Sequence, residues 1–299
     1  MAAGEDHQCG RFLPSSLCLG LSFFVHPMTL PEEIEIYRDR MWRREPELLV
    51  EDVYAAEQFI ESVGFCSALT DSRRPGPSLF IAVCGRRDAH MPRNVQKDPE
   101  SSLTWMLKDE IMRRGKVYYA KLAKGRATFI ARRLVPYFHT LWGLAASREV
   151  TLLSPDAKAI LKPLRKEWEM ATRDLQRASR IGERPRFLRA MDELQRTFKI
   201  IPAEVAYQPT FTYIWTLPES RFHEELTTVH GREDSLREVA RAFLGGAGMT
   251  VRGELARVSG LSAPDAGLGN WALVDEEFAV RMAPGVYRLK EVSGVMKTE

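Results

Sequence analysis

The chain has 299 residues, of which 44% are hydrophobic and 28% charged, and its formal net charge is +3. This length allows two or three small domains with a substantial core, and this composition excludes an intrinsically disordered protein. A net charge this small does not by itself indicate a nucleic-acid-binding protein, so the positions of the charges matter more than their sum.

The cysteines and histidines show no pattern that is typical of a metal site or a disulfide framework. The four cysteines have no C-x-x-C spacing, and the six histidines are scattered along the chain. We therefore expect no metal and no cofactor, and a reducing, cytoplasmic location fits these cysteines.

Residues 1–28 form an unusual leader. Its apolar run, "LCLGLSFFV" at 17–25, is too short to span a bilayer, and acidic residues precede it. Because no small-x-small cleavage site follows, a secretory signal is not indicated. We expect a disordered or spurious leader, with the fold starting where Pro31 and two glutamates begin a helix.

The segment 29–145 is predicted to be an N-terminal helical, winged-helix-like domain. Helical spacing indicates helices at 32–43 and 51–63, and a loop at 70–78 precedes a short helix at 79–86. Ser101 or Ser102 is expected to cap a further helix that ends at Gly115. "KVYYAKL" favours a strand, Gly125 turns the chain, and "ATFIARRLVPYFHTLW" continues as strand and then helix.

The segment 101–138 places aromatic residues among many lysines and arginines. Its aromatics have the spacing of core residues, so we expect most of them to be buried rather than to stack on bases. Its cations form the most basic region of the chain, opposed only by Asp109 and Glu110. The candidate DNA-facing residues here are Lys108, Arg113, Arg114, Lys116 and Lys121.

The carboxyl-terminal half contains an internal echo. "DLQRASRI" at 174–181 and "ELARVSGL" at 254–261 match as acid-Leu-x-Arg-x-Ser-x-apolar. Each of these two segments follows an amphipathic helix and precedes another helix and a hairpin, which is the order of elements in a winged helix. An internal repeat supports this assignment better than a single copy would. We predict a mainly α fold with small β-hairpins (α+β), with tandem winged-helix domains at 146–218 and 219–299.

The third helix of the first of these copies has an apolar stripe (Phe187, Leu188, Met191, Leu194 and Phe198) opposite a basic face. In a helix-turn-helix this helix enters the major groove, where arginines suit phosphates and guanine edges. An ordinary solvated face is the alternative, because Asp192 and Glu193 dilute the charge. The candidate DNA-binding residues are Arg184, Arg186, Arg189, Arg196 and Lys199, with Arg173 and Arg177 on the bracing helix.

The third helix of the second copy, at 263–277, differs. It carries four acidic residues and neither lysine nor arginine, and Gly267 and Gly269 weaken it as a helix. Phosphate would repel such a helix, so we expect this copy to pack or to bind a protein partner. The glycines at 245–248 are interpreted as a linker.

Standard catalytic signatures are absent: the sequence has no P-loop, no G-x-S-x-G, no H-E-x-x-H and no dinucleotide fingerprint in its helix context.

Residues 102–138 resemble the central segment of short bacterial proteins related to the AlkZ/YcaQ DNA glycosylases. The neighbouring segment 59–83 is similar to the same relatives, and the resemblance extends from about residue 32 to near the carboxyl terminus. It implies tandem winged helices, a role in DNA repair, and double-stranded or damaged DNA as the partner. The most specific matches are Leu103, Thr104, Trp105, Lys108, Asp109, Glu110, Tyr118, Tyr119, Lys121, Pro136, Tyr137 and Phe138.

The resemblance departs at the catalytic motif. In the crosslink glycosylases a glutamine, with a second glutamine or an aspartate two residues later, follows a helix and a glycine. The corresponding residues here are Ser67 and Leu69, and a leucine can neither orient water nor stabilise an oxocarbenium-like transition state by hydrogen bonding. The resemblance therefore implies a DNA-binding shape, while the standard glycosylase activity is not expected.

Three functional hypotheses follow. The first is a DNA-binding protein without glycosylase activity. The second is a divergent glycosylase that uses Asp71, Asp109 or Glu110 to activate water at a flipped nucleotide, which requires one of them to line a cleft bordered by basic residues. The third is a protein-interaction module that acts through the acidic second copy.

Overall fold

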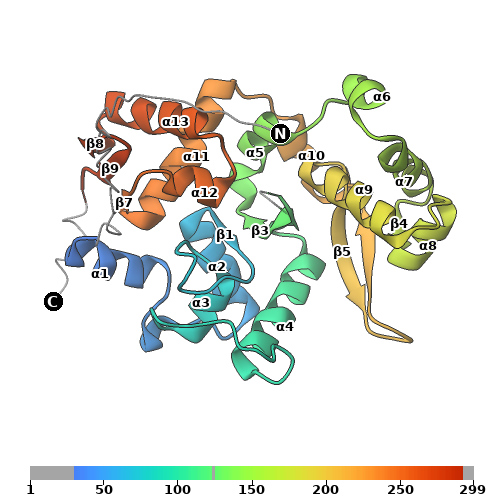
Figure 1. The fold of residues 1–299 in the computed structure, drawn as a ribbon, viewed down its shortest axis with the longest axis horizontal. Coiled ribbons are helices and arrows are strands. Elements are labelled where there is room, and N and C mark those ends of the chain that lie inside the picture. Colours follow the sequence, from blue (N-terminus) through green and yellow to red (C-terminus); the bar gives the residue numbers. More distant parts are fainter. Residues whose placement is uncertain (1–29, 123–124, 292–299) are drawn as a thin grey trace, which may run out of the picture.

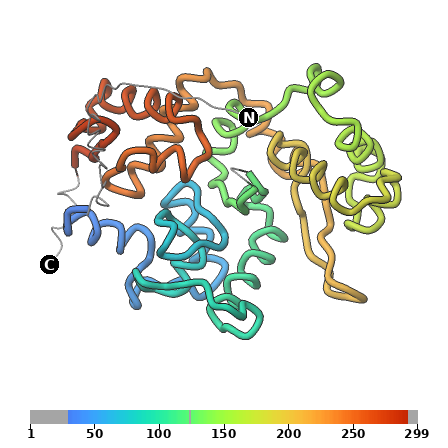
Figure 2. The backbone as a smooth tube through the Cα atoms, in the orientation of Figure 1, coloured from blue at the N-terminus to red at the C-terminus, as the bar shows by residue number. Residues whose placement is uncertain are grey.

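The structure, a computed structural model, describes residues 30–122 and 125–291 (Figures 1 and 2). Helices predominate, and three small antiparallel sheets of three strands accompany them. The predicted fold class, mainly helical with small β-hairpins, is confirmed. The leader expected at 1–28 lies outside the described residues. Over the part of the chain that the structure describes, no helix is both long and apolar enough to cross a membrane.

One order of elements, helix, strand, helix, helix, strand, strand, occurs three times. The first copy comprises α2 (Val53–Val63), β1 (Phe65–Ser67), α3 (Leu79–Cys84), α4 (Pro99–Arg114), β2 (Tyr118–Lys121) and β3 (Ala127–Ile130). The second comprises α7 (Pro155–Glu167), β4 (Glu169–Ala171), α8 (Thr172–Ala178), α9 (Arg184–Arg196), β5 (Ile201–Ala206) and β6 (Thr212–Thr216). The third comprises α11 (Arg232–Ala247), β7 (Met249–Thr250), α12 (Glu254–Ser259), α13 (Ala263–Asp275), β8 (Ala279–Ala283) and β9 (Val286–Leu289).

Each copy also pairs its strands in the same way. The second strand of the hairpin lies in the middle of its sheet, giving the orders β1-β3-β2, β4-β6-β5 and β7-β9-β8. The two copies predicted from the echo are present as helix, helix, helix and hairpin, and the amino-terminal segment supplies a third with the same topology. The domain boundaries that we assigned from the sequence stay a prediction.

Further helices precede the first copy or connect the copies. They are α1 (Glu32–Met41), α5 (Val135–Trp142), α6 (Glu149–Leu152) and α10 (Glu219–Thr227), with 3-10 turns at Pro46–Leu48, Arg132–Leu134 and Ala146–Arg148. The boundary of α4 differs from the prediction at its start: Asp98, and not a serine, is the cap, because its carboxylate accepts a hydrogen bond from the Ser101 N–H at 2.7 Å. Gly115, in the left-handed conformation, ends α4 as expected.

The described residues form two large hydrophobic cores and two small clusters. The first and third copies share one core, in which α11 packs against α2, α5 and α13, whereas the second copy has its own core around Ile160, Leu175 and Leu194. Figure 1 shows the second copy set to one side, with its β5–β6 hairpin extending alongside α4. The aromatics of 101–138 mostly belong to the shared core, as predicted, although Trp105 is partly exposed.

Two glycines of the third copy, Gly246 and Gly269, allow close packing. The predicted linker at 245–248 is wrong, because Gly245 to Ala247 form the last turn of α11, and a Cβ on Gly246 would lie 3.4 Å from the Val63 Cα. A Cβ on Gly269 would lie only 2.5 Å from the Leu236 carbonyl oxygen. Gly269 therefore lets α13 approach α11, and at this position the packing outweighs the low helix propensity of glycine. A Cβ on Gly267 would meet nothing within 4 Å.

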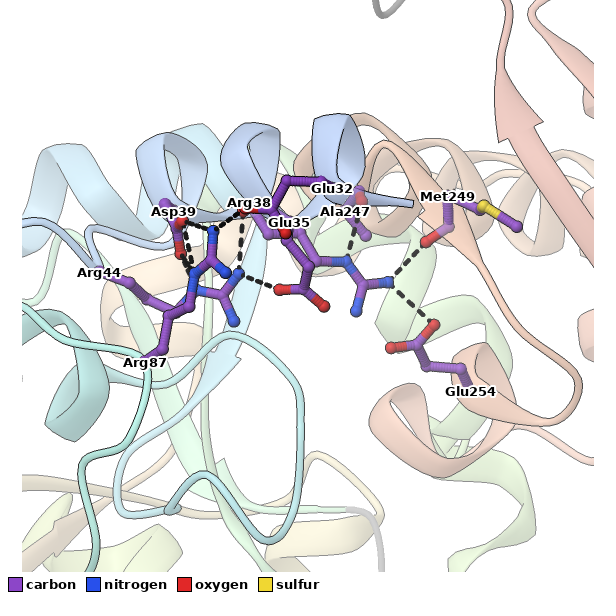
Figure 3. A network of polar contacts seen from close by, with 9 residues as sticks. All are labelled: Glu32, Glu35, Arg38, Asp39, Arg44, Arg87, Ala247, Met249 and Glu254. Atoms are coloured by element: carbon purple, nitrogen blue, oxygen red, sulfur yellow. Dashed lines mark hydrogen bonds and ion pairs between the residues drawn. The ribbon is translucent and has the colours of Figure 1, made fainter. Parts of the chain in front are cut away.

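A buried polar network ties α1 to the third copy (Figure 3). Arg38, 2% exposed, donates to the carbonyl oxygens of Ala247 at 3.0 Å and Met249 at 2.6 Å, and its guanidinium pairs with the Glu254 carboxylate at 3.1 Å. On the same helix, Asp39 receives the guanidinium groups of Arg44 and Arg87. The amino-terminal helix is thus held to the carboxyl-terminal part of the fold by charged groups.

Candidate nucleic-acid interface

The helix α9 occupies the third-helix position of the second copy. Pro185 stands in its first turn, and Phe187, Met191 and Leu194 bury its apolar stripe. Leu188, predicted to be part of that stripe, is 43% exposed. The predicted division of this helix into an apolar and a basic face is therefore present, with one leucine at the border.

The exposed arginines of α9 lie on two sides of the helix. Arg184 lines a cavity that faces the β5–β6 hairpin, whereas Arg186, Arg189 and Arg196 line an open hollow of about 530 Å³ beside Gly125. The helical periodicity of the sequence predicted one face for all of these arginines. This face is more than 100° wide, so one side of it borders the β5–β6 hairpin and the other side borders the hollow beside Gly125.

Some of these arginines have partners within the molecule. Arg186 pairs with the Asp156 carboxylate at 2.8 Å, which raises the pKa of its guanidinium, and Arg196 donates to the Asp192 carbonyl oxygen at 3.2 Å. Arg184 and Arg189 are exposed and form no ion pair with any described residue. These two guanidinium groups are the ones on α9 that are available to an external anion.

The bracing helix α8 shows a similar contrast. Arg177 pairs with Asp174 at 3.3 Å, one turn earlier on the same helix. Arg173 is exposed and, among the residues that the structure describes, has no ion-pair partner. Arg173 therefore joins Arg184 and Arg189 as an available cation.

Two of the predicted DNA-binding lysines are buried, which corrects their assignment. Lys199 is 8% exposed, and its Nζ pairs with the Glu149 carboxylate at 2.6 Å. Lys108 is 2% exposed, pairs with Asp109 at 2.6 Å and donates to the Tyr213 hydroxyl at 3.0 Å. A sequence shows the charge of a lysine but not its partner within the fold, and neither ammonium group can reach a DNA backbone from these positions.

The remaining cations of the first copy lie at its surface. Arg113 pairs with Glu110 at 3.5 Å, and Glu57 receives both Arg114 at 2.7 Å and Lys116 at 3.8 Å. This basic face is thus partly neutralised by carboxylates.

Lys121 connects that face to α9. Its backbone N–H donates to the Gln195 Oε1 at 3.0 Å, and its Nζ lies 3.4 Å from the Asp192 carboxylate. The two predicted basic surfaces, on the first and second copies, therefore adjoin each other at β2.

The three candidate acids lie in different surroundings. Glu110 is half-exposed, and Asp109 is held by Lys108 and by the Tyr207 hydroxyl, which donates to its carboxylate. Asp71 is buried and accepts from the Arg73 backbone N–H at 3.1 Å and from its guanidinium, a hydrogen bond that holds the pKa of the Asp71 carboxyl below its usual range.

Of these acids, Asp71 lines a hollow. This hollow has a volume of about 510 Å³ and is bordered by Leu69, Thr70, Arg73, Arg74 and Met91. Leu69, one of the two residues at the position of the glycosylase motif, is thus part of the same wall, while Ser67 ends β1 and donates its N–H to the Pro77 carbonyl oxygen at 3.1 Å.

A cluster of arginines that the sequence did not predict lies beside this hollow. Arg257 of α12 donates to the Pro75 carbonyl oxygen at 2.6 Å, and the Arg126 guanidinium donates to the Arg257 carbonyl oxygen. Burial lowers the pKa of Arg126, and the positive charges of Arg257 and Arg74 lower it further. Three arginines from distant segments therefore gather here, and no spacing along the chain indicates it.

No group of three or more histidine, cysteine, aspartate or glutamate side chains suited to a metal ion occurs within residues 30–122 and 125–291.

Comparison with known proteins places the chain in a family. Residues 50–241 match the model of the AlkZ-related family. The DNA glycosylase AlkZ of Streptomyces sahachiroi is similar in structure, with a TM-score of 0.51 and 14% identity over 88% of this chain and 71% of that one. At this identity the likeness shows a shared fold.

A weaker match is the DIP2311 protein of Corynebacterium diphtheriae, with a TM-score of 0.19 and 15% identity over 74% of this chain and 42% of that one. No curated protein matches the chain. The family model covers the whole of the first two copies and the first part of α11. As its sequence predicted, the chain belongs to the AlkZ-related family, within the AlkZ/YcaQ-like superfamily.

Proposed function

We propose that this protein is a winged-helix DNA-binding protein, related to the interstrand-crosslink DNA glycosylases but without their standard activity. One observation carries the proposal: Arg184 and Arg189 on α9, and Arg173 on α8, are exposed without an ion pair among the described residues. A guanidinium that has no carboxylate partner can form charge-assisted hydrogen bonds with a phosphate.

The position of these arginines supports duplex DNA as the partner. They belong to the second and third helices of a copy with winged-helix topology, the elements that meet the backbone and the major groove in helix-turn-helix proteins. The fold shared with a DNA glycosylase and the membership of the AlkZ-related family agree with this assignment. With duplex DNA as its partner, the protein would act in the bacterial cytoplasm.

The absence of the standard activity is proposed from Ser67 and Leu69. Neither side chain is an amide or a carboxylate, so neither reproduces the glutamine-based motif. We expect the protein to bind alkylated or crosslinked duplex without releasing a base.

The binding proposal is tested with a double variant, Arg184→Ala/Arg189→Ala, and a fluorescein-labelled duplex followed by anisotropy. We expect the affinity to fall about a hundredfold or more, since hydrogen bonds to charged groups contribute about 1.5–3 kcal/mol each and the variant removes two guanidinium groups. The matched control is Lys162→Ala/Lys166→Ala, which removes the same charge from exposed positions on α7. Equal weakening by both variants would contradict a role for α9.

A divergent glycosylase is the second candidate, and the placement of Asp71 favours it. Its carboxylate lines a hollow together with Arg73 and Arg74, the arrangement that an enzymatic role for one of the acids requires. Because its pKa is low, this carboxylate would stabilise a developing positive charge better than it would accept a proton. Release of an alkylated base by the wild-type protein, lost in Asp71→Asn, would establish this function and refute the inactive assignment.

A protein-interaction role for the third copy is supported by two exposed apolar residues on α13, Leu268 at 59% and Trp271 at 42% exposure. The acidic residues near this helix are compensated within the molecule, since Arg232 pairs with Asp265 and Arg241 pairs with Glu276. A protein that co-purifies with the wild-type chain but not with a Leu268→Ser/Trp271→Ser variant would support this role.

A further inference from the structure

A cavity of about 350 Å³ lies between α9, the β5–β6 hairpin and β2. Its lining is mainly aromatic and apolar, and two of the available arginines, Arg173 and Arg184, complete it. The aromatic rings that line it are those of Tyr119, Phe187, Phe211, Tyr213 and Trp215.

The strand β6 and the segment before it build one wall. Residues two apart on a strand share a face, so Phe211, Tyr213 and Trp215 follow one another along the cavity. The ring centroids of Phe211 and Tyr213 are 5.3 Å apart, and those of Tyr213 and Trp215 are 5.7 Å apart. Phe211 is 52% exposed whereas Trp215 is buried, so the row of rings leads from the surface inwards.

Hydrogen bonds within the protein fix these walls. The Trp215 Nε1 donates to the Thr172 hydroxyl at 3.0 Å, and that hydroxyl donates to the Tyr213 carbonyl oxygen at 3.1 Å. Gln195 donates its amide to the Met191 carbonyl oxygen at 3.3 Å and accepts from the Lys121 N–H at 3.0 Å. These polar groups of the lining are satisfied internally, and the Lys108 ammonium donates to the Tyr213 hydroxyl and lies 5.0 Å from the centroid of its ring. The aromatic surface left for a ligand is therefore mainly that of the exposed Phe211, beside the two guanidinium groups.

The charge of the lining selects an anionic ligand. Arg173, Arg184 and Lys121 are cationic, and Asp192, the one acid of the lining, lies 3.4 Å from the Lys121 Nζ. A ligand that uses both the rings and the guanidinium groups is planar, aromatic and negatively charged. An aliphatic chain or a neutral peptide side chain would use only one of the two.

We propose that this cavity holds one extrahelical nucleotide, with its base against Phe211 and Tyr213 and its phosphate on Arg173 and Arg184. The inference rests on the proposed function, because it assigns to the same DNA-binding surface a preference for DNA in which one nucleotide is unstacked. The cavity is lined by other residues than the Asp71 hollow, so it would retain a nucleotide rather than act on it.

The test compares two labelled duplexes, one fully matched and one with a single bulged nucleotide, by anisotropy. We expect the bulged duplex to bind about fivefold to a hundredfold more tightly, the range that stacking of one base on aromatic side chains provides. Phe211→Ala, at an exposed position, should remove this preference and leave the matched duplex unaffected. The control Tyr54→Ala removes an aromatic ring of similar exposure on α2, outside the cavity, and should keep the preference.

Calorimetry with dAMP, adenosine and inorganic phosphate identifies the source of the nucleotide. Binding of dAMP that is lost in Phe211→Ala and Arg184→Ala supports a site that also accepts free nucleotides, whereas a bulge preference without dAMP binding supports a site that is specific for a nucleotide within a strand.

Equal affinity for both duplexes, together with no binding of dAMP, would overturn the inference. A preference for the bulged duplex that persists in Phe211→Ala, or dAMP binding that persists in it, would also overturn the inference. If the matched duplex still binds in that case, the proposed function stands. If no duplex binds, the proposed function fails, and dAMP binding alone then decides whether the cavity is a nucleotide site.

Discussion

The substitution Arg38→Ala tests the connection between the amino-terminal helix and the third copy. Arg38 lies in α1, outside the segment matched by the family model, and its partners Ala247, Met249 and Glu254 also lie outside it. The wild-type guanidinium compensates two buried carbonyl oxygens and one carboxylate that is itself 3% exposed. Removing the guanidinium leaves the buried Glu254 carboxylate with weaker compensation, from the Val251 N–H at 3.1 Å and the Arg257 guanidinium at 3.9 Å.

The magnitude follows from this burial. Breaking a buried ion pair by removing one partner costs about 3–5 kcal/mol, because the other charge stays buried. Arg87→Ala is the matched control in the same network: Arg87 is 42% exposed, and its partner Asp39 keeps Arg44 at 2.9 Å. We expect that variant to lose about 1 kcal/mol or less.

The assay is urea-induced unfolding followed by circular dichroism, from which the free energies of unfolding are compared. A double variant, Arg38→Met/Glu254→Leu, should recover most of the stability, because it removes the buried Glu254 charge and fills the space of the ion pair with apolar side chains. An equal decrease in stability for Arg38→Ala and Arg87→Ala would refute this reasoning, as would a double variant that is less stable than the single one.

Three further predictions concern packing, pH and the corrected lysine. Gly269→Ala should lower the free energy of unfolding by about 1–3 kcal/mol, because the added methyl group overpacks the contact with Leu236. Gly267→Ala should raise the free energy of unfolding slightly, because its added methyl group meets nothing within 4 Å and alanine favours a helix. Thermal unfolding compares the two variants. The hydrogen bond from Arg73 lowers the pKa of the Asp71 carboxyl, so the stabilisation from this pair is complete above the unfolded-state pKa and is lost as pH falls through the folded-state pKa. Urea unfolding across acidic pH should therefore show a smaller loss of stability for Asp71→Asn than for the wild-type protein. Lys199→Ala should lower stability in urea while leaving the salt dependence of DNA binding unchanged, and a reduced salt slope would contradict its burial.

Much of the fold could be predicted from local patterns. Apolar periodicity located the helices α7, α9 and α11, and the echo at 174–181 and 254–261 identified two copies of one topology. The first copy was not recognised as a full equivalent, because long loops precede and follow its helix α3. Its first strand, β1, has three residues, the same as β4. Strands this short have no periodicity of their own, and their pairing with β3 depends on contacts between distant segments.

The candidate site could be predicted less completely, for a physical reason. Charge and helical spacing indicated the arginines of α9, and Arg184 and Arg189 are indeed exposed. The partner of a charged residue is decided by the tertiary fold, however, so the burial of Lys108 against Asp109 and of Lys199 against Glu149 could not be read from the chain. The clustering of Arg74, Arg126 and Arg257 and the aromatic cavity beside α9 could not be predicted either, because both depend on contacts between segments that are distant in the sequence.

The most direct test of the central claim is the affinity for a matched DNA duplex measured across a salt series, for the wild-type protein and for Arg189→Ala. If α9 binds the DNA backbone, the logarithm of the affinity falls linearly with the logarithm of the salt concentration. The variant then binds more weakly, and its slope is smaller by about one unit, because one phosphate is no longer neutralised by an arginine. Binding that does not respond to salt, or a slope that is the same for both proteins, would contradict a DNA-binding role for α9.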